Sequence, residues 1–503
     1  MEFASVLFIE LFLPAVLIMY YLLGLIRKES VKTTARNIFL LASSLIFYAF
    51  GGINELLLFV GLIALNFFAG IIMGAVDPEK KKGTRRAVFI VTLLLNVGLL
   101  VFFKYTTMFI SMFNMFKASG SFGEAMNGLL NFSTGVVAEG VLKVVMPLAF
   151  SFIIFQSISY ISDVYLQKIK PTRNILTYSL YMTLLAQLTQ GPIMRFGNLG
   201  SQIESREHTL DGFMNGLRRF IYGLGKKVLI ANVVAVGVDK IFNSTKTYMD
   251  VSKMGAPIAW LGIFLYTIQI YYDFSGYTDM AIGVGGMLGF KIDENFNYPY
   301  TAFSVQEFWR RWHISLSTWF KDYIYIPMGG SRCSKARACF NVAVVFFVTG
   351  IWHGANLTFI VWGLIFVVMS IIERLFLGKL LAKNPVKPLN WLYTILVVMI
   401  GWVFFRSDTL AFAGSYIGQM FSFKGSEAGY SVLSYLNLEI ILALIFGIIL
   451  CGALQRPLSG PFSKIKDKKA VRIIELVFLA FVFAFCLIKI VGGSYAPSIY
   501  QNF

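Results

Sequence analysis

The chain has 503 residues, of which 57% are hydrophobic and only 14% are charged. Soluble domains carry about 25% charged residues, so the composition excludes a soluble enzyme. The formal net charge of +18 arises from basic residues in short loops between apolar runs, so it reports membrane orientation and does not imply a nucleic-acid partner.

Apolar runs recur from one end of the chain to the other, and about 20 apolar residues suffice to cross a bilayer. The runs are Phe3–Ile26, Leu56–Val76, Ala87–Phe103, Val144–Ile161, Ala256–Tyr272, Trp391–Phe405, Ile440–Leu454 and Ile473–Ile488. They are too long and unbroken for the strands of a membrane β-barrel. We therefore predict an all-α polytopic membrane protein with about 11 spanning or partly spanning helices, the first of them a retained helix.

Basic clusters predict how the helices are oriented, because Lys and Arg favour cytoplasmic loops. The clusters lie in residues 27–36, 80–86, 168–173, 332–337, 379–387 and 464–472. By contrast, residues 118–142 contain Glu124 and Glu139 but no Lys or Arg, which predicts an external segment. Counting the crossings between these loops places both chain ends outside.

Neither repeats nor cysteine motifs divide the chain. No period of 20–50 residues recurs, and no matching halves of the transporter type are present. Cys333, Cys339, Cys451 and Cys486 lack metal-ligand spacing, so no metal site is predicted. We therefore predict a single membrane-embedded domain over residues 1–503.

Two stretches do not fit simple spans. Thr209–Lys227 carries apolar residues at helical spacing with polar residues on its other faces, which predicts an amphipathic helix at the cytoplasmic interface. Asn295–Arg332 is dense in aromatic and charged residues and is too polar to face lipid. It should form short helices packed inside the protein, where irregular backbone is tolerated.

The segment Asn341–Phe376 has basic loops on both flanks, so it must enter the membrane and return. Its rising arm, Asn341–Ile351, would climb roughly 16 Å as a helix, which is about half of a ~30 Å hydrocarbon core. We therefore predict a re-entrant hairpin with His353 at its apex, near the middle of the membrane.

His353 is the first candidate for chemistry, because ionisable groups are expensive in hydrocarbon and those that persist there are usually functional. A neutral imidazole can accept a proton from a hydroxyl and return it to a leaving group. Gly354 allows close backbone approach, and Asn356 can orient the ring or a substrate. The alternative is a core histidine satisfied by a backbone carbonyl or by Asn356.

A second candidate is the run Phe308–Ser317, which contains Trp309, Arg310, Arg311, Trp312, His313 and Ser317. As one helix it would place its aromatic residues on one side, with His313 at the margin. The alternative is an interfacial helix with an aromatic belt and arginines that reach toward the headgroups.

The third candidate is the polar run Tyr272–Asp279, where Asp273 and Asp279 follow an apolar span. Its carboxylates and hydroxyls could bind a cation or a polar substrate. The favoured alternative is a helix break in which the two aspartates act as caps or pair with Arg310 or Arg311.

Several catalytic motifs are absent from the sequence. It contains no G-x-S-x-G elbow, no Walker-type loop, no G-x-G-x-x-G opening a helix and no H-E-x-x-H. These absences argue against a serine hydrolase, ATP-driven transport and zinc hydrolysis. A mid-membrane histidine instead favours group transfer to a hydroxyl, with donor and acceptor arriving from opposite faces.

The motifs in the second half of the chain also resemble a known family. The strings are DFSGYTDMAIG, ENFNYPY and FWRRWHISLSTWFKDYIYIPMGG between Asp273 and Gly330, IWHGAN at Ile351–Asn356, QLTQGPIMR at Gln187–Arg195 and APSIYQNF at Ala496–Phe503. Together they resemble the membrane-bound O-acyltransferase family, and within it the bacterial alginate O-acetylation branch. The teichoic acid D-alanylation branch is a more distant relative that lacks the string at Ile326–Gly330. The resemblance implies a catalytic core at about residues 178–376.

The resemblance implies roles for individual residues. His353 matches the family's catalytic histidine, and His313 matches the second histidine of the bacterial branch. The residues expected to bind substrate are Asn356, Trp312, Arg310, Arg311, Asp273 and Ser317. No metal and no permanently bound cofactor is expected.

The resemblance also implies a reaction and its partners. The enzyme would sit in the bacterial cell membrane among lipids and move an acyl group, most simply acetyl, from a cytoplasmic thioester to a hydroxyl. The donor would be acetyl-CoA or a carrier-protein thioester. An extracytoplasmic SGNH-type acyltransferase or esterase would be the partner, and a cell-wall or secreted polysaccharide the final target. The alternatives are D-alanyl transfer to teichoic acid, a proton-coupled transporter or flippase using His353 and Asp273, and a scaffold subunit.

Overall fold

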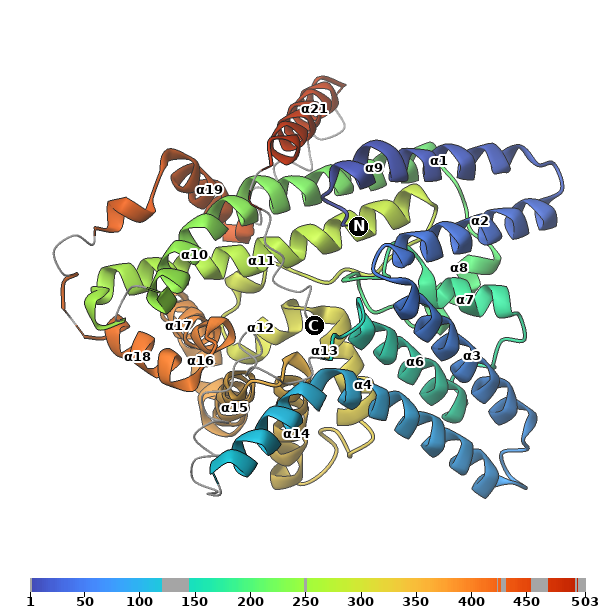
Figure 1. Cartoon of the computed structure of the whole chain (residues 1–503), viewed down its shortest axis with the longest axis horizontal. Coiled ribbons are helices and arrows are strands. Elements are labelled where there is room, and N and C mark those ends of the chain that lie inside the picture. The colour runs from blue at the N-terminus through green and yellow to red at the C-terminus, as the bar shows by residue number, and fades with distance from the viewer. Residues whose placement is uncertain are drawn as a thin grey trace.

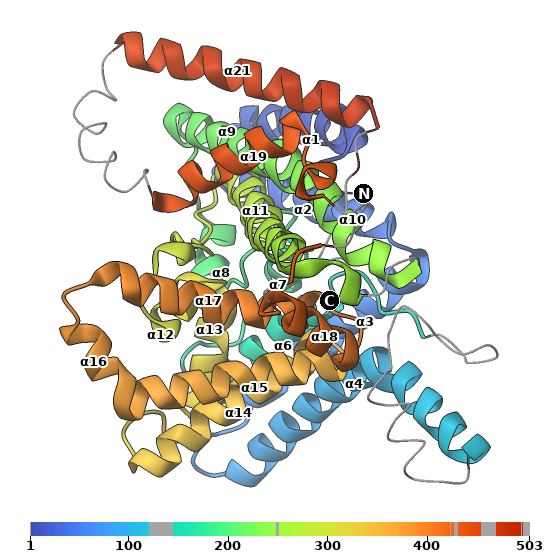
Figure 2. The same ribbon diagram turned by 90° about the vertical axis from the view of Figure 1, so that its left-hand side faces the viewer.

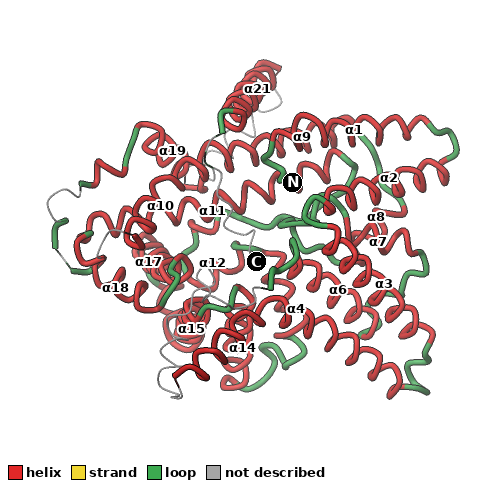
Figure 3. Tube along the Cα trace, viewed as in Figure 1, coloured by secondary structure: helices red, strands yellow, loops and turns green. Residues whose placement is uncertain are grey.

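The chain forms helices joined by loops, and the described residues include no strand (Figures 1 and 3). The computed structural model describes residues 2–119, 144–247, 251–422, 424–426, 431–453, 469–493 and 495. The predicted all-α class is therefore confirmed. The predicted external segment with Glu124 and Glu139, the basic residues 464–468 and the C-terminal string Ala496–Phe503 lie outside the described residues.

The first group of helices precedes residue 205. It comprises α1 (Leu13–Leu22), α2 (Glu29–Ala49), α3 (Ile53–Ala75), α4 (Lys82–Ser119), α6 (Phe150–Tyr165), α7 (Ile175–Thr183) and α8 (Phe196–Glu204). The π-helical η1 (Leu7–Phe12) and the 3₁₀ turn η2 (Leu23–Leu25) extend α1 in both directions. The resulting run, Leu7–Leu25, is long and apolar enough to cross a bilayer.

The central group runs from α9 to η6 and includes the break between two short helices at His313. It comprises α9 (Leu210–Gly225), η3 (Lys226–Ala231), α10 (Asn232–Thr247), η4 (Val251–Lys253), α11 (Gly255–Met287), η5 (Pro299–Thr301), α12 (Val305–Arg311), α13 (Ile314–Phe320) and η6 (Lys321–Tyr325). The short helices α12 and α13 bury Phe308 and Leu316 in the interior, as predicted for Asn295–Arg332.

The last group begins with a helical hairpin. It comprises α14 (Lys335–His353), α15 (Leu357–Ile372), η7 (Glu373–Leu377), α16 (Gly378–Lys383), α17 (Lys387–Arg406), α18 (Leu410–Met420), η8 (Val432–Tyr435), α19 (Leu438–Ile448), η9 (Ile449–Ala453) and α21 (Lys469–Val491). Figures 1 and 2 show α21 along one edge of the molecule, beside α9.

Eight helical segments among the described residues are long and apolar enough to cross a membrane, so the predicted number of about 11 is not confirmed. Two predicted runs form helices that are short for a crossing, because α6 has 16 residues and α19 has 11. The helix α11 has 33 residues, but most of its side chains are buried against other helices. A helix enclosed by protein needs no lipid-facing apolar surface.

The closest helix contact joins α9 to α11 through glycines. A Cβ atom built on Gly216 would lie 2.7 Å from the backbone oxygen of Gly283, and one on Gly223 would lie 2.6 Å from that of Gly276. Real Cβ contacts are longer, so only glycine lets the two backbones approach this closely. Small residues at such spacings are typical of packing between membrane helices.

This contact corrects the prediction of an isolated interfacial helix at Thr209–Lys227. The helix α9 begins where predicted, and the Thr209 hydroxyl caps it by accepting the Gly212 N–H at 3.0 Å. However, η3 continues it directly into α10, and Leu210–Phe242 forms one candidate span of 33 residues. Gly216, Phe220, Gly223 and Leu224 of α9 are buried, whereas Leu210 at its start is 77% exposed.

The predicted hairpin around His353 is confirmed, but its length is not. The helix α14 ends at His353 and α15 begins at Leu357, so His353 lies at the apex. The arm begins at Lys335, and its 19 residues make it about 28 Å long. The rising arm is therefore longer than the predicted Asn341–Ile351, because the helix starts within the basic loop, and the depth of His353 in the membrane stays a prediction.

Figure 2 shows α16 and the start of α14, which carry basic residues, at the left-hand edge. The last turns of α4 lie at the opposite, right-hand edge, where the predicted external segment begins. The orientation inferred from the Lys and Arg clusters stays a prediction.

Candidate active site

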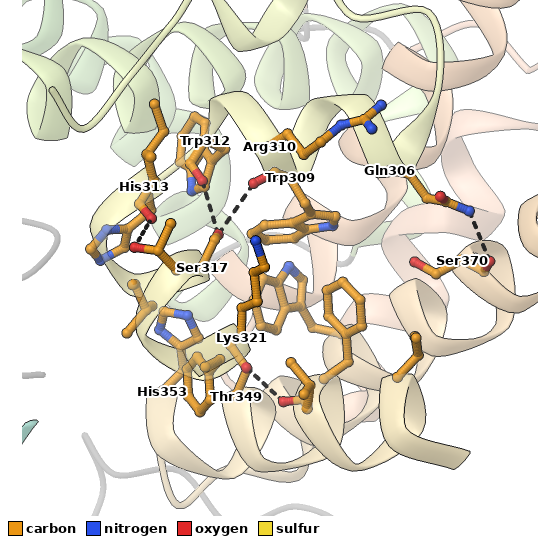
Figure 4. A pocket seen from close by; sticks show the side chains of 18 of the residues that line it. Gln306, Trp309, Arg310, Trp312, His313, Ser317, Lys321, Thr349, His353 and Ser370 are labelled. Atoms are coloured by element: carbon orange, nitrogen blue, oxygen red, sulfur yellow. Dashed lines mark hydrogen bonds between the residues drawn. The ribbon is translucent and has the colours of Figure 1, made fainter. Parts of the chain in front are cut away.

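A cavity of about 400 Å³ contains both histidines singled out from the sequence. Its walls come from α12, α13, η6, α14, α15, η7 and α17, and Figure 4 shows His313 and His353 at one end, away from Gln306 and Ser370. The cavity lies between two buried apolar clusters, since Leu316 and Phe320 belong to one cluster and Trp312 and Trp402 to the other.

His353 is held by aromatic rings at the end of α14. Its ring centroid lies 4.6 Å from that of Trp352, 4.8 Å from that of Trp362 and 5.0 Å from that of Phe405. Only 6% of the residue is exposed. Rings packed on several sides leave the imidazole little freedom, so its position is set before any substrate binds.

The hairpin that carries His353 is fixed by close backbone packing. A Cβ atom on Gly363 would lie 2.6 Å from the backbone oxygen of Phe346, and one on Gly350 would lie 2.7 Å from that of Phe359. The Tyr105 hydroxyl of α4 also donates a hydrogen bond to the carbonyl of Ile351 in the last turn of α14. The end of α14 is therefore attached to α15 and to α4.

His313 lies at a break between two short helices. The sequence analysis treated Phe308–Ser317 as one helix, but α12 ends at Arg311 and α13 begins at Ile314. His313 adopts φ +45°, the left-handed region that is uncommon for residues other than glycine. The break turns His313 toward the cavity, where the continuous helix would have placed it at a margin.

The His313 ring is buried and holds one hydrogen bond. Only 3% of the residue is exposed, and the Phe274 ring packs edge-on at 4.7 Å between centroids. Its Nδ1 lies 3.1 Å from Asn295 Oδ1, whereas Nε2 has no hydrogen-bond partner among the described residues. His313 lies outside the candidate spans, and burial lowers its pKa to about 3, so the ring is neutral near pH 7.

Five of the eight predicted site residues line the cavity, namely His353, His313, Trp312, Arg310 and Ser317. Trp312 packs against Trp402 with 5.1 Å between centroids, which joins α12 to α17. The Ser317 hydroxyl donates to the carbonyls of Trp309 and Trp312 at 3.2 and 3.3 Å. Ser317 thus holds the end of α12 against α13 as well as facing the cavity.

The other three predicted site residues lie elsewhere. Arg311 pairs with Glu307 and donates to the Thr301 hydroxyl at 2.9 Å, so it stabilises α12. Asn356 precedes α15, and its Nδ2 donates to the carbonyl of Asp408 at 3.2 Å. Neither residue lines the cavity.

Asp273 does not mark a helix break, because α11 runs through it without interruption. It pairs with Lys227 of η3 and lines a separate cavity of about 140 Å³. Asp279 pairs with Arg219 at 2.7 Å and with Lys226 at 2.5 Å. The predicted pairing of these aspartates with Arg310 or Arg311 is therefore wrong, because the α9–α11 packing brings basic residues of the preceding helix to them.

The charges around the cavity are all positive. Arg310, Lys321 and Arg374 line it, and the described lining residues include no Asp or Glu. Lys321 and Arg374 were not predicted as site residues, and their only sequence signal is a position near the predicted cytoplasmic loops. Trp362, Trp402 and Phe405 were not predicted either, because they reach the site only through the folding of α15 and α17. No group of three or more metal-ligating side chains occurs among the described residues.

Fold and site together define a multi-pass helical membrane protein with a buried, histidine-lined cavity suited to acid–base chemistry. The profile of the membrane-bound O-acyltransferase family matches residues 166–407. The chain is 36% identical to a probable alginate O-acetylase of Pseudomonas putida over all of both chains. It is 34% identical to a peptidoglycan O-acetyltransferase of Helicobacter pylori, covering 84% of this chain and 80% of that protein.

A teichoic acid D-alanyltransferase of Bacillus subtilis is less similar, at 26% identity over 53% of this chain and 68% of that protein. The chain belongs to the membrane-bound O-acyltransferase family and is an O-acyltransferase of the cell membrane. The family predicted from the motifs is thus confirmed, and the matched residues include the predicted core at 178–376.

Proposed function

We propose that this enzyme moves an acetyl group from a cytoplasmic thioester to a hydroxyl acceptor, for O-acetylation of a cell-wall or secreted polysaccharide. The observation that carries the proposal is the cavity with two buried histidines at one end and three cations along its walls. The relatives named O-acetylase or O-acetyltransferase support acetyl as the group, since they match most of the chain at 34–36% identity.

The charge of the cavity supports an anionic donor. Arg310, Lys321 and Arg374 face a space that has no carboxylate among its described lining residues. Guanidinium and ammonium groups bind phosphate well, and a positive field draws anions toward the site. Acetyl-CoA and a phosphopantetheine-linked carrier protein both present a thioester on a phosphate-bearing arm. The donor is a substrate, and no bound cofactor is part of the proposal.

The two histidines supply the acid–base chemistry of the transfer. His353 takes the proton from the acceptor hydroxyl as its oxygen attacks the thioester carbonyl, so the C–O bond forms. The C–S bond then breaks, and the proton passes to the departing thiolate to give the free thiol. His313, which lines the same cavity, assists through Nε2, the ring nitrogen that has no hydrogen-bond partner among the described residues. A positioned general base contributes about 10²–10⁴-fold in rate.

The acetyl group must continue to a polymer outside the cell, which calls for an acceptor reachable from the external side. We propose an extracytoplasmic SGNH-type acyltransferase or esterase as the partner, with a serine or tyrosine hydroxyl as the first acceptor. Trp312 and Ser317 would contact substrate from the cavity wall, together with Arg310. Arg311, Asp273 and Asn356 do not line the cavity, so the substrate contacts first expected of them are not part of the proposal.

The test uses all three histidines of the chain. His353→Gln and His313→Gln proteins are purified, reconstituted in vesicles and supplied with acetyl-CoA labelled in the acetyl group. Both should lose about 10²–10⁴-fold in transfer rate, while His208→Gln, outside the cavity, should transfer at the wild-type rate. Wild-type transfer by a properly inserted His353→Gln protein would overturn the catalytic assignment.

The acyl group is tested separately, by mass spectrometry of surface polymers from a deletion strain and from the strain complemented with the wild-type gene. Loss and recovery of acetyl esters is the expected result. Loss of D-alanyl esters would instead assign the enzyme to D-alanyl transfer, and unchanged polymers with altered solute movement would favour a transporter.

A further inference from the structure

We propose that Asn295 is a positioning residue that fixes the tautomer of His313, so that Nδ1 carries the proton and Nε2 presents its lone pair to the cavity. The catalytic use of that lone pair rests on the proposed function, but the tautomer itself does not. Asn295 belongs to the string ENFNYPY but was not among the predicted site residues; it lies in the loop between α11 and η5 and is 1% exposed.

Three groups converge on the side-chain oxygen of Asn295. Its Oδ1 lies 3.1 Å from the backbone nitrogen of Ser315, 3.0 Å from the Ser315 hydroxyl and 3.1 Å from His313 Nδ1. The main-chain oxygen of Asn295 also accepts the N–H of Ile314 at 2.9 Å. One loop residue therefore contacts three consecutive residues at the break between α12 and α13.

These contacts fix the orientation of the amide. A backbone N–H can only donate, so the Asn295 atom that faces Ser315 must be the oxygen and not the nitrogen. The amide oxygen can only accept, so His313 Nδ1 must carry the hydrogen in the bond between them. A neutral imidazole carries one N–H, which leaves Nε2 as an acceptor. The backbone thus settles an assignment that is ordinarily made from side chains alone.

Asn295 also takes the place of an N-terminal capping residue for α13. Ile314 and Ser315 are the first two residues of α13, and their N–H groups lack partners within the helix. His313 occupies the capping position but makes no capping bond with its side chain. Asn295 accepts both N–H groups from outside the helix, which leaves the imidazole free to face the cavity.

The surroundings of Nε2 are consistent with an acceptor that meets substrate. It is buried, has no hydrogen-bond partner among the described residues and belongs to a residue that lines the cavity. The titratable and charged groups that share this cavity are His353 on α14, Arg310 on α12, Lys321 on η6 and Arg374 on η7. A lone pair at this position can accept the hydrogen of an incoming hydroxyl.

The tautomer is measured directly on the full-length protein in detergent micelles or vesicles. Because the chain has only three histidines, ¹⁵N-histidine labelling gives few resonances. The variants His208→Gln and His353→Gln assign them by loss of signal. The expected spectrum shows His313 with a protonated Nδ1 and an unprotonated Nε2. A wild-type spectrum with the proton on Nε2 overturns the proposal, whatever the activity.

Three variants separate positioning from simple stabilisation. Ser315→Ala removes one side-chain donor but keeps the backbone N–H, so the tautomer should be unchanged. Asn295→Asp keeps an accepting oxygen, so it should keep both the cap and the tautomer. Asn295→Ala removes the acceptor, so both tautomers should appear and kcat should fall by about 10- to 10⁴-fold, the upper limit being the loss for a wrong histidine tautomer. The KM for the donor should not change.

The pH dependence of the transfer rate in the Asn295→Asp variant reports on the contact with His313. It would not change if Asn295 only capped α13. A carboxylate beside Nδ1 favours the charged ring and raises the pKa of His313. If His313 acts in its neutral form, the acid limb of the rate profile moves to higher pH. If wild-type protein keeps the Nδ1-protonated tautomer of His313 but transfers no acetyl group, only the proposed function is refuted. If the Asn295→Ala protein keeps that single tautomer, the role of Asn295 is refuted.

Discussion

Replacement of Gly363 by alanine tests whether the α14–α15 contact sets the position of His353. The added Cβ would lie 2.6 Å from the backbone oxygen of Phe346, and ordinary contact begins at 3.4 Å. Because the opposing atom belongs to the backbone, the two helices must separate by about 0.8 Å, and overpacking of this kind costs about 1–3 kcal/mol. His353 is the last residue of α14 and moves with it.

The expected loss follows from the displacement. A misplacement of about 1 Å at a catalytic group can cost about 10²-fold, so kcat/KM for Gly363→Ala should fall by up to about 10²-fold. Transfer of labelled acetyl groups by vesicle-reconstituted protein measures this loss, and the thermal midpoint in detergent reports folding. The matched control is Gly98→Ala on α4, where an added Cβ meets nothing within 4 Å. That change should leave activity intact and slightly favour the helix. Wild-type kcat/KM in Gly363→Ala would refute the reasoning.

Three further predictions follow from charged groups. Asp273→Asn should destabilise the protein by about 1.5–3 kcal/mol because it weakens the hydrogen-bonded ion pair that Asp273 makes with the buried Lys227, and the double variant with Lys227→Met should recover part of the lost thermal midpoint; an unchanged midpoint in the single variant would contradict a structural role. Arg374→Gln should raise the KM for an anionic donor by roughly tenfold with little change in kcat, and the salt dependence of KM should weaken, which a KM titration at two ionic strengths checks. Burial beside Arg36 and Arg206 lowers the pKa of His208 to about 4 from the usual 6.5. The unfolded chain therefore binds more protons between those values, so stability is full above pH 6.5 and is lost as pH falls toward 4. His208→Gln should lose less stability than wild type when thermal unfolding at pH 7 and pH 5 is compared.

Much of the fold could be predicted because hydropathy is a local property of the chain. The apolar runs around α3, α17 and α21 each became a helix close to the predicted bounds, whereas α4 extends well beyond its predicted run at both ends. The prediction of helix positions and lengths failed where these depend on packing between helices. The interfacial assignment of α9 ignored its glycines, which hold it against α11. The length of α14 was also misjudged, since the charged residues at its start belong to the helix.

The candidate site was predictable in part. His353 stood out because an imidazole in an uncharged run is unusual, and His313 because the surrounding motif resembled a family. The ion pair of Arg311 could have been anticipated, because Glu307 lies four residues before it, a spacing that forms ion pairs along a helix. The ion pair of Asp273 could not, because Lys227 is 46 residues away in sequence and only the α9–α11 contact brings the two together.

Both histidines stand where regular helical structure stops, one at the end of α14 and one at the left-handed break before α13. A residue inside a helix has its orientation set by the helix, whereas a residue at a terminus can turn toward a cavity if other groups satisfy the exposed backbone. The neighbouring backbone groups are satisfied by Tyr105 at the first position and by Asn295 at the second. Neither supporting residue is near its histidine in sequence, so the sequence motifs identify the two histidines but not the residues that hold them in place. If both histidines are catalytic as proposed, the reaction geometry depends on these two distant loop and helix contacts as much as on the histidines themselves.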